Sequence, residues 1–168
     1  FPEAQSWMFD ACSEEQIKEY ILPLMEGKRK DCYAITESGS GSDVANLEST
    51  ARKTDEGYVL NGEKWYVTSA NLADYFWFQA YIPEEDEDAL FLVDKDTEGI
   101  KMIASPLFSH TYAAHHPTYK FENVFVEHNQ RVGKPGDGMS FTHSWFRHER
   151  LMIGARSCGA AARLIEEA

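Results

Sequence analysis

A stretch rich in glycine and serine holds the first side chains able to do chemistry. Residues 32–43 read C-Y-A-I-T-E-S-G-S-G-S-D, so a short apolar run gives way to two glycines and three serines. Glycine adopts positive φ without steric penalty, and backbone N–H groups of such a loop can converge on an anion together with hydroxyl groups. The GxGxxG and Walker patterns are absent. By itself the stretch fits an anion site or an ordinary loop.

A carboxylate near the end of the chain is the second candidate. Glu149 lies in the sequence W-F-R-H-E-R-L at 145–151, among apolar residues. Partial desolvation raises the pKa of a carboxyl group toward neutrality, which suits a general base. The alternative is an exposed helical glutamate paired with a neighbouring arginine.

The six histidines all lie in the second half of the chain, and three fall within H-T-Y-A-A-H-H at 110–116. Imidazole suits zinc or nickel. However, no H-E-x-x-H pattern occurs, and no cysteine or carboxylate stands at ligand spacing. We therefore expect no metal, and instead a loop that lines a cofactor or a subunit contact.

A second motif follows the first. Residues 58–70 read Y-V-L-N-G-E-K-W-Y-V-T-S-A. In order, spacing and residue type, the two stretches resemble the acyl-CoA dehydrogenase family, whose middle domain has Y-x-x-T-E-P-x-x-G-S-D followed by x-L-N-G-x-K-x-W-I-T-N-x. The resemblance extends from about Ser13 to the end of the chain.

This resemblance implies flavin-dependent α,β-dehydrogenation of an acyl-CoA thioester. A glutamate would remove the α-proton, and N5 of FAD would accept hydride from the β-carbon, because only a cofactor can supply such an electron sink. The family also implies an electron-transfer flavoprotein as acceptor, a homodimer or homotetramer, and a location in the bacterial cytoplasm or the mitochondrial matrix. Two alternatives remain open: a flavin oxidase or monooxygenase on the same scaffold, and a non-catalytic β-barrel binding module.

The resemblance also assigns residues. A flavin needs an aromatic or apolar wall and hydroxyl donors, and the family's cofactor contacts fall on Tyr33, Ile35, Thr36, Ser42, Tyr66, Val67 and Thr68. Its acyl-CoA contacts fall on Ser42, Arg147, His148, Glu149 and Arg150. Most members carry the catalytic base on a later helix, but the isovaleryl-CoA and long-chain branches place it in an E-R-L context that matches Glu149.

The match to the family is poorest at four places. Ser38 and Glu127 replace prolines, Trp65-Tyr66 replaces an x-Trp pair, and Tyr112 stands where an arginine is frequent. Tyr66 retains an aromatic wall, whereas the changed histidine loop leaves the substrate subclass open.

The elements that must position these residues are mainly strands. A helix is expected from Ser13, where a capping box with Gln16 begins an apolar stripe, with a kink at Pro23 and an end at Gly27. Asn61 and Gly62 predict a type I′ hairpin. A helix of roughly 28 residues is expected after Gly138, long for a globular protein. The expected strands are 33–36, 49–54, 57–60, 63–69, 75–82, 89–94, 101–105, 118–121 and 124–126.

We therefore expect a mainly β fold with flanking helices, similar to the β-barrel middle domain of the family. The resemblance divides the chain into the end of an N-terminal helical domain (1–30), the middle β-barrel domain (31–135) and the truncated first helix of a C-terminal helical domain (136–168). Because the chain begins at Phe1 and stops within a helical pattern, we expect a fragment.

Composition limits the function classes. The 168 residues are 43% hydrophobic, which is typical of a globular domain. A formal net charge of −12 argues against nucleic acid or an anionic membrane as partner. No apolar run approaches the roughly 20 residues of a membrane span. Three separated cysteines and no cleavable presequence indicate reduced intracellular thiols.

Overall fold

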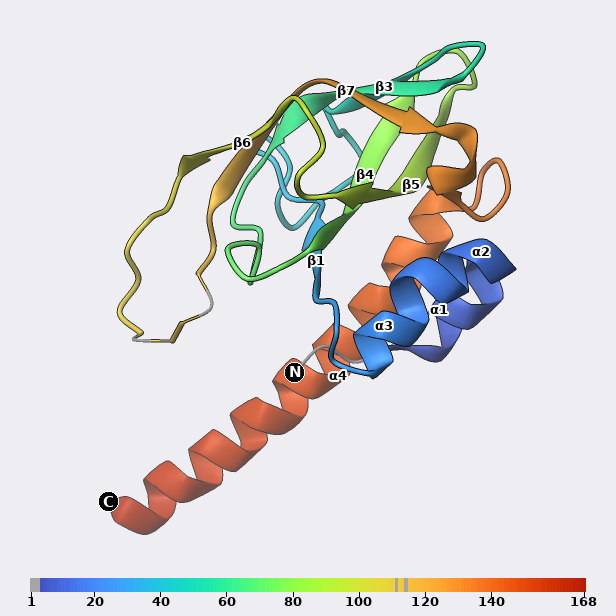
Figure 1. Cartoon of the computed structure of the whole chain (residues 1–168). Helices are drawn as coiled ribbons and strands as arrows, with labels where there is room; N and C mark the ends of the chain where they lie inside the picture. Colours follow the sequence, from blue (N-terminus) through green and yellow to red (C-terminus); the bar gives the residue numbers. More distant parts are fainter. Residues whose placement is uncertain (1–3, 111, 114) are drawn as a thin grey trace.

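One sheet of eight strands forms the centre of the molecule, and helices cover part of one face (Figure 1). The computed structural model describes residues 4–110, 112–113 and 115–168. The strand order is β6-β7-β3-β2-β4-β5-β8, and β1 pairs with β4 off this path. The strands are β1 (Asp31–Ala34), β2 (Thr50–Lys53), β3 (Gly57–Lys64), β4 (Tyr75–Ile82), β5 (Glu87–Asp94), β6 (Ile100–Ala104), β7 (Thr118–Glu127) and β8 (Arg131–Val132).

The sheet folds back on itself, as a barrel-like core requires. Strands β4 and β7 are not neighbours in the sheet, yet Phe76 contacts Tyr119 and Phe78 contacts Phe121, with ring centroids 5.1 and 4.4 Å apart. These rings belong to a buried cluster that fills the inside of the fold. The expectation of a mainly β middle-domain fold with flanking helices is confirmed.

The outer face of β4 and β5 carries the second core. Alternation along β4 sends Phe76 and Phe78 inward and sends Tyr75 and Trp77 toward the helices. The helices on this face are α1 (Ser6–Ala11), α2 (Glu14–Gln16), the π-helical turn η1 (Ile17–Ile21), α3 (Leu22–Met25) and the first turns of α4 (Gly138–Glu167). A 3₁₀ turn, η2 (His128–Gln130), precedes β8.

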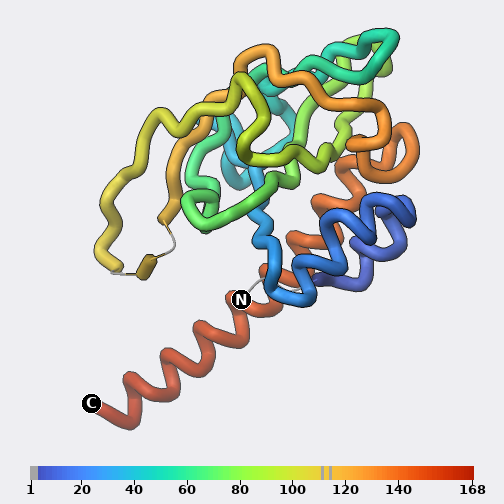
Figure 2. Tube along the Cα trace, in the orientation of Figure 1, coloured from blue at the N-terminus to red at the C-terminus, as the bar shows by residue number. Residues whose placement is uncertain are grey.

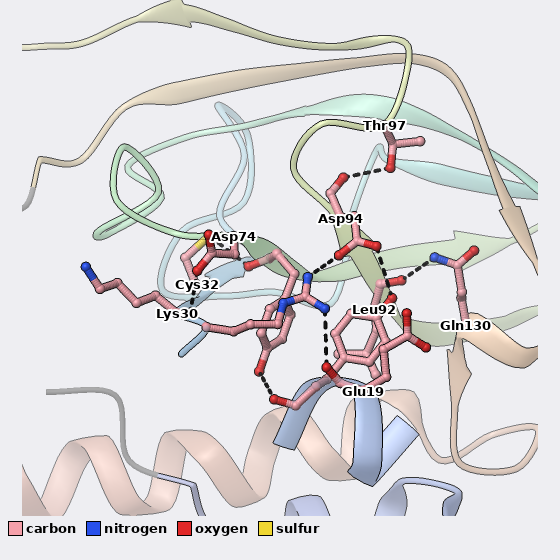
Figure 3. Close-up of polar contacts among 11 residues, drawn as sticks. Glu19, Lys30, Cys32, Asp74, Leu92, Asp94, Thr97 and Gln130 are labelled. Atoms are coloured by element: carbon pink, nitrogen blue, oxygen red, sulfur yellow. Dashed lines mark hydrogen bonds and ion pairs between the residues drawn. The ribbon is translucent and has the colours of Figure 1, made fainter. Parts of the chain in front are cut away.

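A polar network fixes the start of β1 (Figure 3). Arg29 forms an ion pair with Asp94 at the end of β5 and donates a 3.3 Å hydrogen bond to the backbone carbonyl of Glu19. The Lys30 N–H donates to Asp74 Oδ2 at 2.7 Å. These contacts hold β1 between β4 and the helices, and thereby position the residues that follow it.

The helix predicted from Ser13 is confirmed at both ends. The Ser13 hydroxyl accepts a hydrogen bond from the Gln16 N–H, and Gln16 Oε1 accepts one from the Ser13 N–H. The chain ends the helix at Gly27, with φ +69°. Between them, a π-helical turn runs directly into α3, so Pro23 lies within one continuous helical stretch. Proline has no N–H to offer the Glu19 carbonyl four residues earlier, and that carbonyl accepts a hydrogen bond from Arg29.

The predicted hairpin at Asn61 and Gly62 is wrong. Strand β3 runs unbroken through both residues and pairs with β2 on one side and β7 on the other. A Cβ at position 62 would lie 2.1 Å from Oγ of Ser49, so the glycine serves close packing at a β-bulge rather than a turn.

Several strand boundaries also differ from the prediction, and those of β2, β5 and β6 do so by one or two residues. Strand β3 ends at Lys64, and residues 65–70 form a turn in which Tyr66 and Ser69 have φ values of +52° and +66°. The two strands expected at 118–121 and 124–126 form the single strand β7. Strand β1 begins and ends two residues earlier than the predicted 33–36.

Helix α4 changes its surroundings along its length. Figures 1 and 2 show its first turns beside β5 and α1 and the rest extending away from the sheet. Residues buried in this helix are Gly138 and Thr142, and large apolar side chains such as Leu151 and Ile165 are exposed. Within the described residues, no helix has the length and apolarity needed to cross a membrane.

The three cysteines are unpaired. Cys12 and Cys32 are buried, and burial raises the pKa of Cys12 to about 12 and that of Cys32 well above its usual value. Cys158 is exposed on the distal part of α4.

Candidate functional site

A cavity of about 430 Å³ opens between β1, the 65–70 turn, α1 and α4. Residues from four separate stretches of the sequence line it. Those predicted as cofactor or substrate contacts are Tyr33, Ile35, Thr36, Tyr66, Thr68, His148 and Glu149. The two motif stretches and the α4 carboxylate therefore meet at one place.

Direct hydrogen bonds join the two motif stretches. The Trp65 N–H donates to the Thr36 carbonyl at 2.8 Å. Lys64 Nζ donates to the Ile35 carbonyl at 3.1 Å and to Glu37 Oε1 at 2.7 Å. Residues 35–37 are thus fixed to the end of β3, which places Thr36 at the cavity.

The Lys64–Glu37 pair is fully enclosed, with side chains 0% and 3% exposed. Burial lowers the pKa of Lys64 to about 8, although Glu37 opposes that shift. Burial also favours protonation of Glu37, but the Lys64 ammonium and neighbouring donors outweigh it and lower the pKa of the carboxyl group. Both groups are therefore charged at neutral pH. The ion pair fixes residues 35–37 to the end of β3, next to the cavity.

Stacked aromatic rings join α4 to β1. Tyr33 stacks on Trp145 at 4.1 Å between centroids with an interplanar angle of 3°, and on Trp77 at 5.7 Å with an angle of 10°. Both faces of the Tyr33 ring are therefore covered. Its hydroxyl is buried and has no hydrogen-bond partner among the described residues, so it is an unsatisfied polar group on a residue that lines the cavity.

The 65–70 turn supplies the opposite wall. Tyr66 is 50% exposed and Thr68 places its hydroxyl 2.9 Å from Nδ1 of His116. Val67 is buried in the core, and its N–H donates to the Pro117 carbonyl at 2.9 Å. The positive φ of Tyr66 turns the chain so that residues 66 and 68 line the cavity while residue 67 faces inward.

The glycine–serine loop is closed by its own hydrogen bonds. Ser40 Oγ donates to the Asp43 carbonyl at 2.7 Å, and the Ala45 N–H donates to Asp43 Oδ1 at 3.0 Å. Gly41 lines the cavity, whereas Ser42 is exposed and does not.

The α4 residues separate into two groups. His148 and Glu149 line the cavity. Arg147 donates to Ser144 Oγ at 3.0 Å on an exposed face, and the guanidinium of Arg150 lies 5.5 Å from the ring centroid of Phe146. The structure therefore does not bring these two arginines to the cavity.

Sequence reasoning missed several lining residues. Asp31 accepts a 2.9 Å hydrogen bond from Trp77 Nε1, and burial raises the pKa of its carboxyl group. Trp65 and Trp145 also contribute to the wall. A lone aspartate at the first position of a strand carries no sequence signal, and the contact of Trp145 with Tyr33 joins distant positions in the chain. Among the residues described, no three histidine, cysteine or acidic side chains gather as a metal site would require.

Known proteins resemble this chain in both sequence and fold. The profile of "Acyl-CoA dehydrogenase, middle domain" matches residues 32–124. Benzylmalonyl-CoA dehydrogenase of Aromatoleum aromaticum is 32% identical over 86% of this chain and 39% of its own length. A probable acyl-CoA dehydrogenase from Mycobacterium abscessus has a TM-score of 0.81 at 27% identity, covering 88% of this chain and 40% of its own. An FAD complex of PigA has a TM-score of 0.76 at 28% identity, covering 82% and 37%.

The chain thus spans about two fifths of the length of the proteins it matches. The matched profile contains both motif stretches and most of the sheet that positions them. This chain belongs to the acyl-CoA dehydrogenase family.

Proposed function

We propose that this chain binds FAD and takes part in the α,β-dehydrogenation of an acyl-CoA thioester. The observation that carries the proposal is the meeting of Thr36, Thr68 and Glu149 at one cavity, from three stretches far apart in the sequence. Family membership and the fold shared with PigA, which has been solved with FAD, support it.

The donor set of the cavity fits a flavin. Its walls combine aromatic and apolar side chains with hydroxyl groups, as a flat ring with a polar edge requires, and the buried Tyr33 hydroxyl has no partner among the described residues. We assign cofactor contact to Tyr33, Ile35, Thr36, Tyr66 and Thr68, and we assign Ser42 and Val67 from the family motif alone. Bound FAD would supply the hydride acceptor that amino-acid side chains lack.

Glu149 is the candidate base. It is half-buried on the cavity side of α4, next to His148. From there its carboxylate would accept the α-proton of the thioester. We assign acyl-CoA contact to Ser42, Arg147 and Arg150 from the family motif alone, since none of the three lines the cavity, and the two arginines would offset part of the net charge of −12.

The remaining features of the activity follow the family. We propose an acyl-CoA substrate, an electron-transfer flavoprotein as acceptor, and a homodimeric or homotetrameric assembly. The proposed location is the bacterial cytoplasm or the mitochondrial matrix.

Anaerobic bleaching tests the proposal. The flavin-loaded protein should lose its yellow absorbance when acyl-CoA is added, and Glu149→Gln should retain flavin but bleach about 10²–10⁴-fold more slowly, since that is the usual contribution of a general base. Glu166→Gln, exposed near the end of α4, is the matched control and should bleach normally.

Three outcomes contradict parts of the proposal. Normal bleaching of Glu149→Gln would show that the base lies elsewhere. Rapid reoxidation in air would indicate an oxidase or monooxygenase. Absence of flavin binding would leave a non-catalytic binding module.

A further inference from the structure

The loop between β6 and β7 is fastened to the turn that carries Thr68. Figure 2 shows the described residues of the segment 105–117 extending beyond one end of the sheet. Backbone and side-chain hydrogen bonds of 2.8–2.9 Å connect this loop to the turn: Val67 N–H to Pro117 O, Ser69 N–H to His115 O, Asn71 Nδ2 to Ala113 O, and His115 N–H to Asn71 Oδ1. Ala113, His115 and Pro117 are therefore held against the turn that carries Thr68, and His116 lies between two of these anchored residues.

Two of these histidines form a hydrogen-bonded chain that ends at the cavity. The Tyr112 N–H donates to Nδ1 of His110 at 3.3 Å, and Nε2 of His110 lies 3.0 Å from Nε2 of His116. Nδ1 of His116 lies 2.9 Å from the Thr68 hydroxyl. Phe108 stacks on the His110 ring with an interplanar angle of 5° and contacts His116 edge-on, which holds both rings in place.

The geometry fixes where the protons lie when both histidines are neutral. Nδ1 of His110 accepts from a backbone N–H, so the ring proton of His110 is on Nε2. That N–H points at Nε2 of His116, so Nε2 of His116 must be a hydrogen-bond acceptor. The ring proton of His116 is therefore on Nδ1. His116 therefore donates to Thr68, and the Thr68 oxygen is an acceptor in this contact.

The Thr68 proton must then go elsewhere. Among the described residues, the other acceptor recorded beside this hydroxyl is the Tyr66 carbonyl, at the long distance of 3.5 Å. Thr68 lines the cavity. A hydroxyl that already accepts from His116 is thus oriented to donate to an acceptor placed in the cavity.

We propose that His110 and His116 are positioning residues, which make the Thr68 hydroxyl a hydrogen-bond donor to an acceptor atom at the edge of the flavin. This inference rests on the proposed function for the identity of the acceptor. The positions of the ring protons follow from protein contacts only and do not depend on a bound flavin. The pair acts only through Thr68.

The surrounding charge supports a neutral pair. The segment 65–71 contains no acidic or basic residue, and within 105–117 the ionisable side chains are His110, His115, His116 and Tyr112. Burial lowers the pKa of His116, and the nearby His110 and His115 lower it further. A second proton on His116 would also set two N–H donors against each other across 3.0 Å.

The first test needs no cofactor. Long-range ¹H–¹⁵N NMR of the flavin-free protein at about pH 8 distinguishes the two neutral tautomers, and we expect the Nε2–H form for His110 and the Nδ1–H form for His116. The Nε2–H form at His116 would overturn the proposal.

The second test measures FAD affinity in a double-mutant cycle. His116→Phe should weaken FAD binding about fivefold, equivalent to one neutral hydrogen bond, and should have no further effect in a Thr68→Val background, because His116 acts through that hydroxyl. His116→Asn places an amide donor where Nδ1 was and should restore affinity to within about twofold. His128→Asn, a histidine bonded to the Asp55 carbonyl, is the control and should bind FAD normally.

The outcomes separate this inference from the proposed function. If wild type binds no FAD, the proposed function fails, and the NMR result still decides the proton arrangement. If wild type binds FAD but His116→Phe is without effect, or its effect adds to that of Thr68→Val, the positioning role is overturned while the proposed function stands.

Discussion

The two walls of the cavity are held in place by different forces. The wall formed by residues 31–37 is anchored by the enclosed Lys64–Glu37 pair and by the Tyr33 ring between two tryptophans. The wall formed by residues 65–71 depends on hydrogen bonds to the loop 105–117, many of them within reach of solvent. Local opening costs least where few apolar side chains are buried. The first wall should therefore open only with global unfolding, and the second should open locally.

The largest expected effect comes from breaking the enclosed ion pair. Lys64→Met leaves the Glu37 carboxylate buried without its cation and should lower the free energy of unfolding by about 3–5 kcal/mol. Urea denaturation measures the loss. The matched control is Lys101→Met, which removes an ion pair whose side chains are 68% and 43% exposed and should cost at most about 1 kcal/mol. Equal losses in the two variants would contradict the contrast between enclosed and exposed pairs.

The aromatic anchor should give the next largest effect. Trp145→Ala removes the ring stacked on Tyr33 and should lower the free energy of unfolding by about 2 kcal/mol. The loss combines the apolar surface that the half-buried tryptophan removes from water with the interaction between the two stacked rings. Trp145→Phe keeps a ring and should lose less than half as much. If hydrogen exchange in Trp145→Ala becomes faster only in α4 and not in β1, the stack does not hold the wall formed by residues 31–37.

Loosening the second wall should have a smaller and local effect. Asn71→Ala removes the side-chain bonds to the Ala113 carbonyl and the His115 N–H, worth about 1–2 kcal/mol together. Hydrogen exchange should speed up in residues 65–71 and 105–117 while β4 and β5 keep their protection. Faster exchange throughout the sheet would remove the distinction between the walls.

The smallest expected effect is a dependence on acid. Burial favours protonation of Glu37, but Lys64 and neighbouring hydrogen-bond donors outweigh burial and lower the pKa of the carboxyl group from its ordinary 4.5. Its contribution to stability is present above pH 4.5 and is lost as the pH falls through the lowered folded pKa. Urea midpoints at about pH 6 and about pH 3.5 should differ more in wild type than in Glu37→Gln. If the urea midpoint shifts equally between the two pH values in wild type and in Glu37→Gln, other groups cause the acid sensitivity.

Local signals in the sequence predicted most of the fold. The capping box at Ser13, the end at Gly27 and the long helix after Gly138 depend on nearby residues and were confirmed. The two motif stretches were expected to meet, and the Trp65–Thr36 hydrogen bond joins them.

The errors lie where distant residues override local preference. Asn61-Gly62 has hairpin chemistry, but the close approach of Ser49, the residue before β2, is what requires the glycine. Tyr66 and Ser69 are adjacent to β-prone residues, yet tertiary hydrogen bonds from the loop 105–117 hold a turn there. The same limit applies to the site, because neither the Trp145–Tyr33 stack nor the His116–Thr68 bond has a local signature.

The contrast among the three thiols has a practical consequence. Thiolate is the reactive form, and burial keeps Cys12 and Cys32 protonated and inaccessible, whereas Cys158 is exposed on the distal part of α4. A maleimide fluorophore should therefore attach at a single position of the folded, unmutated chain. The attached dye would report the binding of another protein or domain to that end of the helix, without disturbing the cavity.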